Sequence, residues 1–81
     1  MTPTSVAEHL DLPWAIELEP ERQPDDSIVY VARNPELEGV MSHGSTPEQA
    51  LVNLREARAL ALQVYIEAGW MIPQPRVLTP A

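Results

Sequence analysis

The feature that most restricts the fold of this chain is one long segment with helical signals, residues 47–68. Thr46 suits the N-cap position and Pro47 the first helical position, and Gln49 completes a Thr-x-x-Gln capping box. Gly69 offers a left-handed residue at the other end. The sequence therefore predicts a helix over residues 47–68, which is a large part of an 81-residue chain.

Apolar side chains recur along this helix with the period of an amphipathic surface helix. Most of them fill one broad arc, which we expect to lie on a sheet: Ala50, Leu54, Ala57, Ala61, Val64, Tyr65 and Ala68, with Leu51 and Leu62 at its edge. A thinner stripe at seven-residue spacing consists of Val52, Ala59 and Ile66. Such a stripe can be incidental surface apolarity, but a small domain often needs a partner subunit for stability. The stripe is therefore our candidate contact for a homo-oligomer, either a dimer or a tetramer.

Three segments before the helix have strand patterns. Residues 14–19 alternate apolar and other side chains, as a half-buried strand does, and residues 28–33 are rich in β-branched and aromatic side chains on both faces. The second segment suits a central strand that is covered on both sides. Residues 40–43, between Gly39 and Gly44, predict a short third strand. Short connections between the three favour an antiparallel meander.

The remaining segments are short and rich in proline. Residues 20–27 predict a solvated hairpin loop, residues 4–10 a short helical turn, and residues 70–81 an extended strap or a short C-terminal edge strand. Together the patterns predict one α+β domain over residues 1–81, a three-stranded antiparallel meander with one long helix packed on it. Trp14 and Trp70 could stack on a ligand, but each adjoins a turn, where an aromatic side chain more often covers the core.

The net charge of −7 comes from the first half of the chain. Residues 1–40 hold nine acids against Arg22 and Arg33, whereas later acids and arginines balance, and there is no lysine. Because nucleic-acid binding depends on basic surfaces, direct binding to DNA or RNA is disfavoured. An acidic surface attracts basic partners, although many soluble proteins are acidic merely for solubility. Asp25 and Asp26 in the hairpin loop are our candidate contacts for a basic partner.

No arrangement of residues predicts catalysis. A phosphate loop needs several glycines and usually a lysine, and Gly44 stands alone before the helix. His43 and Ser42 are strand neighbours, which point to opposite faces. The acids occupy loops and alternate strand positions, as on a solvated surface, and the chain has no cysteine and two distant histidines. We therefore expect no enzymatic activity, cofactor or metal. The longest apolar run, residues 28–32, is too short to cross a membrane, so we expect a cytoplasmic protein.

Two segments, YVARNPELEGVMSHGSTPEQALVNLREA and EAGWMIPQPR, resemble the HicB-like antitoxin family. The shared pattern is an aromatic-Val-Ala strand, Pro-Glu-Leu-x-Gly, a Gly-x-Thr-x-Glu-x-Ala-Leu helix start and a closing Gly-x-x-Ile-Pro-x-Pro. The resemblance covers most of the chain, from Leu10 to Arg76. The chain departs from the pattern at Ser45, where an acid is common, and at Val40, where a cysteine is common. It also lacks the C-terminal DNA-binding segment of longer relatives.

The resemblance implies a partial ribonuclease-H-like module that lacks the nuclease acids and neutralises a small basic toxin of the HicA type, an mRNA interferase. It also implies architectural roles for a set of turn and cap residues: Gly39, Gly44, Thr46, Pro47, Gln49 and Gly69. Two alternatives stay open, a stand-alone oligomeric module that binds another partner or ligand, and a degenerate nuclease that retains metal binding.

Overall fold

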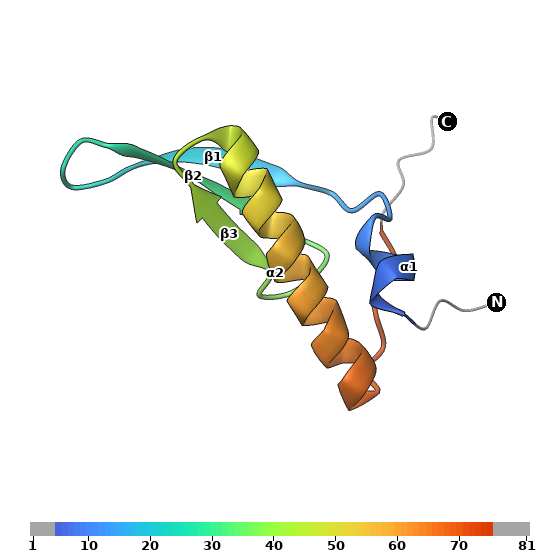
Figure 1. Cartoon of the computed structure of the whole chain (residues 1–81). Coiled ribbons are helices and arrows are strands. Elements are labelled where there is room, and N and C mark those ends of the chain that lie inside the picture. Colours follow the sequence, from blue (N-terminus) through green and yellow to red (C-terminus); the bar gives the residue numbers. More distant parts are fainter. Residues whose placement is uncertain (1–4, 76–81) are drawn as a thin grey trace.

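The computed structural model describes residues 5–75 and consists of one sheet and two helices (Figure 1). The strands form a single antiparallel sheet in the order β1-β2-β3, so the predicted meander and the α+β class are confirmed. In chain order the elements are α1 (Val6–Leu10), β1 (Glu17–Arg22), β2 (Ile28–Arg33), β3 (Met41–Gly44) and α2 (Pro47–Ala68). Within residues 5–75, neither helix combines the length and the apolar character needed to span a membrane.

The ends of α2 lie where the sequence predicts them. The Thr46 hydroxyl accepts a hydrogen bond from the backbone N–H of Gln49 at 3.0 Å, Pro47 occupies the first turn, and Gly69 adopts φ 72°. The side chain of Gln49 donates to Asn53 one turn later (3.1 Å). Of the two hydrogen bonds of the predicted capping box, the one accepted by Thr46 is present. The Gln49 side chain bonds to Asn53 within the helix instead.

The strand limits differ from the prediction mainly in β1. β2 matches residues 28–33, and β3 is displaced by one residue from 40–43. β1 begins three residues later than predicted and continues into the segment 20–27, so the prediction of a loop over that whole segment is wrong. The register explains the difference, because β1 pairs with β2 over the full length of both strands. Backbone pairing continues through Pro20 and Glu21 despite their poor strand propensity.

α2 packs across β3 and β2 and leaves β1 uncovered (Figure 1). Ile16 is 52% exposed and Leu18 39%, so the prediction of a half-buried first strand is wrong. Alternation identifies the two faces of a strand but not whether another element covers either of them. The core lies under α2 from Ala50 to Leu62 and around the β2–β3 loop, and consists of Trp14, Ala32, Leu37, Val40, Ala50, Leu54 and Leu62.

The second half of α2 extends beyond the sheet (Figure 1). Ala50 and Leu54 are buried as predicted, but Val64 is 51% exposed and Ala68 is also exposed. The predicted arc therefore holds from Ala50 to Leu62 and is wrong at Val64 and Ala68. The buried row runs instead through Leu54, Arg58 and Leu62, at four-residue spacing.

The two tryptophans differ in their surroundings. Trp14 is buried in the core, as expected, whereas Trp70 is 60% exposed and its ring lies edge-on to Tyr65 with centroids 5.7 Å apart. The prediction that Trp70 covers the core is wrong, because the turn at Gly69 places it beside the last turn of α2. Residues 70–75 form no regular secondary structure, and the rest of the predicted strap lies outside the described residues.

The joint between β3 and α2 is closely packed. A Cβ added to Gly44 would lie 2.6 Å from the backbone nitrogen of Ala50, which is shorter than any normal contact. Ser42 donates to the backbone oxygen of Ala50 (2.7 Å), and Asn53 donates to that of His43 (2.8 Å). The joint depends on a glycine at position 44 because the helix backbone passes directly over it.

We predict that Gly44→Ala destabilises the fold by about 2 kcal/mol, because the added methyl group would force the first turn of α2 away from β3. The free energy of unfolding from urea titration measures the loss. Ser45→Ala, at the exposed neighbouring position, serves as the control and should change stability little. Equal stability of Gly44→Ala and Ser45→Ala would contradict the close packing of the α2 backbone over Gly44.

Candidate protein-binding surface

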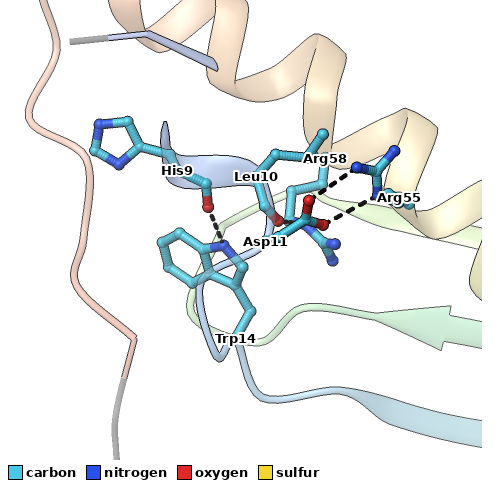
Figure 2. A network of polar contacts seen from close by, with 6 residues as sticks. All are labelled: His9, Leu10, Asp11, Trp14, Arg55 and Arg58. Carbon is cyan, nitrogen blue, oxygen red and sulfur yellow. Dashed lines mark hydrogen bonds and ion pairs between the residues drawn. The ribbon is translucent and has the colours of Figure 1, made fainter. Parts of the chain in front are cut away.

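Three polar side chains among the described residues are buried, His9, Asn34 and Arg58, and active sites often contain such groups. Arg58 is buried and donates from Nε to the backbone oxygen of Leu10 (2.9 Å) and from Nη1 to the side-chain oxygen of Asn34 (3.0 Å). Figure 2 shows the Arg58 guanidinium reaching from α2 toward Leu10. Burial lowers the pKa of Arg58, and the nearby Asp11 carboxylate opposes that shift. These contacts attach the N-terminal segment to α2.

Further hydrogen bonds hold the same segment on the sheet. The indole N–H of Trp14 donates to the backbone oxygen of His9 (2.8 Å), and Asn34 donates from Nδ2 to the backbone oxygen of Ala15 (2.9 Å) (Figure 2 for the first contact). Asn34 is 1% exposed, and its amide nitrogen and oxygen are both used in hydrogen bonds within the fold, to Ala15 and from Arg58. The cluster therefore sets the position of the chain that leads into β1, which is a structural role.

An exposed ion pair supports the same attachment. Arg55 makes two hydrogen bonds to the Asp11 carboxylate, at 3.0 and 2.9 Å (Figure 2). These bonds hold the pKa of Asp11 below its usual value. A lowered carboxyl pKa stabilises the fold above the ordinary pKa of an aspartate, and this contribution is lost as the pH falls through the lowered value. Because both side chains are solvent-exposed, the contribution is small.

The sheet face away from α2, here called the open face, is covered by no element of residues 5–75 (Figure 1). Ala32 and Ser42 face the helix, since Ala32 is fully buried and Ser42 bonds to α2. Side chains alternate along a strand, and directly paired residues share a face. The register therefore places eight side chains on the open face: Glu17, Glu19 and Glu21 of β1, Val29, Val31 and Arg33 of β2, and Met41 and His43 of β3.

The open face combines a row of acids with an apolar centre. The three glutamates stand at alternate positions of β1, roughly 7 Å apart along the strand. Beside them is a shallow hollow lined by Glu21, Gln23, Val29, Val31, Met41 and His43. Arg33 lies opposite Glu17 in the register at one end, while Glu19 and Glu21 lie opposite Val31 and Val29. Over most of its length the row therefore carries unbalanced negative charge next to apolar side chains.

The turn between β1 and β2 adds acids at one end of the open face. Asp26 has φ 71°, and its backbone N–H donates to the oxygen of Gln23 (2.9 Å). Asp25 accepts bonds from the backbone N–H (3.0 Å) and the hydroxyl (2.6 Å) of Ser27, which lower the pKa of its carboxyl. Both aspartates are exposed and continue the negative charge of β1 to the tip of the hairpin.

The residues predicted for self-association lie on one flank of α2. Val52 is 55% exposed, whereas Ala59 and Ile66 are half-buried. α1 packs against α2 on this side, where Arg55 and Arg58 reach Asp11 and Leu10. The stripe is thus less accessible than its sequence suggests.

The predictions for Ser42, His43 and Gly39 agree with the structure. Ser42 and His43 project from opposite faces of β3, and Gly39 has φ 82° in the β2–β3 loop. Across residues 5–75, no three histidine or acidic side chains are grouped as a metal site would require.

Sequence reasoning missed two features. The predicted loop over residues 20–27 includes Glu21, although the spacing of Glu21 from Glu17 and Glu19 continues the alternation of β1. Arg58 was not identified as buried, although it lies four residues from both Leu54 and Leu62 and so shares their side of the helix. In both cases the sequence signal is the spacing of the residue from neighbours on the same face of its strand or helix.

Comparison of the chain with models of protein families, with curated proteins and with solved structures finds no match.

Arg58 and Arg55 provide a matched test of the attachment between α1 and α2. We predict that Arg58→Met destabilises the fold by about 2 kcal/mol, because the buried side chain of Asn34 and the oxygen of Leu10 lose their donor. Arg55→Met removes an exposed pair and should have little effect on the denaturation midpoint. A larger loss in Arg55→Met than in Arg58→Met would contradict this assignment.

Proposed function

We propose that this chain is a protein-binding module that holds a small basic protein on the open face, as an antitoxin of the HicB-like type holds a HicA-like toxin. The observation that carries the proposal is the exposure of β1. All six residues of this strand are exposed, although the strand is paired with β2 along its whole length. An edge strand covered on neither face gains little stability from packing, and a partner packed on it would supply the missing contacts.

The chemistry of the open face favours a basic partner. Glu17, Glu19 and Glu21 present carboxylates at a regular spacing that arginine and lysine side chains of another protein can meet. Val29 and the exposed Met41 offer apolar contact near them, while Val31 at the centre is only 8% exposed, and an apolar centre with a charged border is typical of specific protein interfaces. Long-range attraction to the acidic row would raise the association rate, while the apolar contacts would determine how long the complex lasts.

The resemblance to the HicB-like antitoxins adds a class of partner. That family neutralises small toxins whose RNA-binding surfaces are basic, and an acidic sheet face is complementary to such a surface. The motifs that carry the resemblance are Tyr30 to Ala32 in β2, Pro35 to Gly39 in the β2–β3 loop, Gly44 to Leu51 at the start of α2, and Gly69 to Pro75 after it. Most of them build the joint between the sheet and α2, and of them only Val31 belongs to the open face.

The direct test is co-purification with the product of a neighbouring gene that encodes a small basic protein toxic on its own. We expect that product to bind this chain, and binding to weaken as salt concentration rises, because the contact depends on charge. Failure to bind any such product, or binding that is independent of salt, would contradict the proposal and favour a module for another kind of partner.

A triple variant locates the contact. We predict that Glu17→Gln, Glu19→Gln and Glu21→Gln together weaken binding by roughly tenfold or more, mostly through slower association. The matched control neutralises three exposed glutamates of α2, Glu48, Glu56 and Glu67, which changes the net charge equally. Titration calorimetry at fixed salt compares the two. Equal losses would show that net charge alone governs binding.

A further inference from the structure

One end of the open face carries a cation. Arg33, the last residue of β2, is the only arginine among the eight side chains of this face and lies opposite Glu17 in the register. Arg33 and Glu38 both line a hollow of about 200 Å³ beside the β2–β3 loop. This end of the face therefore holds two acids, Glu17 and Glu38, against one arginine.

The other end of the open face carries acids alone. Glu21 ends the acidic row of β1, and the turn that follows adds Asp25 and Asp26, which are both exposed. Arg22 lies opposite Ile28 in the register and so projects from the face on which α2 packs. Three acids thus stand at this end, and no arginine of residues 5–75 shares the open face with them there.

The side chain of Arg33 is available to a partner. In the part of the chain that the structure describes, it makes no hydrogen bond or ion pair, whereas the side chains of Arg55 and Arg58 are both engaged in hydrogen bonds. Arg33 is half-buried and lies opposite Met41 in the register. Packing of its apolar stem keeps the charge at this end of the face, while the guanidinium remains free to meet a charge of another protein.

We propose that Arg33 sets the direction in which a basic partner docks on the open face. The inference rests on the function proposed for this face and specifies the partner further. The cations of the partner lie toward the hairpin turn, and one of its carboxylates lies beside Arg33. An acid in place of Arg33 would give three acids at each end, and a basic segment would then dock equally well in either direction.

The two ends of the face are far enough apart to act separately. Glu17 and Glu21 are four residues apart in β1, which corresponds to roughly 13 Å. Because charges are screened over about 8 Å at physiological ionic strength, a side chain of the partner responds mainly to the charges of the end it touches. In the reversed direction a cation would meet Arg33, and like charges across an interface disfavour binding. Two misplaced surface charges together favour one direction by roughly tenfold.

A synthetic peptide with lysines in one half and a single glutamate at the opposite end tests the direction. The peptide is blocked at both termini and carries a nitroxide beside the glutamate, and nuclear magnetic resonance of the full chain records which backbone amides the nitroxide broadens. We expect broadening around Arg33 and Met41 and little at the hairpin turn, residues 23–27. In Arg33→Glu both ends should broaden to a similar extent. Arg22→Glu, which changes the net charge equally from the other face of the hairpin, is the matched control and should leave the direction unchanged.

Circular dichroism checks that both variants keep the fold, and Arg33→Gln, a smaller change, should show an intermediate preference. A peptide with glutamine in place of its glutamate should also orient less strongly. The inference is overturned if the nitroxide broadens the hairpin turn of the unchanged chain, or if Arg33→Glu and Arg22→Glu have the same effect on the direction. In either case the peptide still binds the open face. Absence of saturable shift changes on that face would instead contradict the proposed function, and the inferred direction with it.

Discussion

The buried contact between Arg58 and Asn34 fixes how α2 lies on this small sheet. It joins the middle of the helix to the residue that follows β2, while the same two side chains hold Leu10 and Ala15 of the N-terminal segment. With its middle fixed at this point and its first turn packed against Gly44, α2 covers β3 and β2 but cannot also cover β1. The second half of the helix consequently extends past the sheet. The exposed first strand and the exposed helix flank are thus two results of a single placement.

The edges of the sheet are less available for binding than its face. β1 contains Pro20, which has no N–H to donate to an added strand. At the other edge, Asn53 of α2 donates to the backbone oxygen of His43 in β3. Prolines and side-chain contacts of this kind discourage strand addition at sheet edges. A partner of the proposed kind would therefore contact the side chains of the open face, where the glutamates of β1 lie beside Val29 and Met41.

Local signals predicted the elements well, and contacts between distant residues account for the errors. The limits of α2 follow from Thr46, Pro47 and Gly69, and those of β2 from six strand-forming residues in a row. The end of β1 could not be predicted in this way, because pairing with β2 extends the strand through Pro20. The sequence also does not show which surfaces another element covers. Leu18 and Val64 have the spacing of buried residues but lie where no other element packs on them. For the same reason, the sequence identifies Glu17, Glu19 and Glu21 as acids, but only the pairing of β1 with β2 shows that they lie together on the open face.

Charge and shape act on the open face at different distances. The net charge of −7 would attract a basic protein before contact, and added salt screens such an attraction. Contact would depend instead on Glu17, Glu19 and Glu21, whose positions relative to Val29 and Met41 are fixed by the pairing of the three strands. Loss of the pairing between β1 and β2 would remove the alignment of these acids without changing the net charge. The proposed binding therefore depends on the folded sheet and not on composition alone.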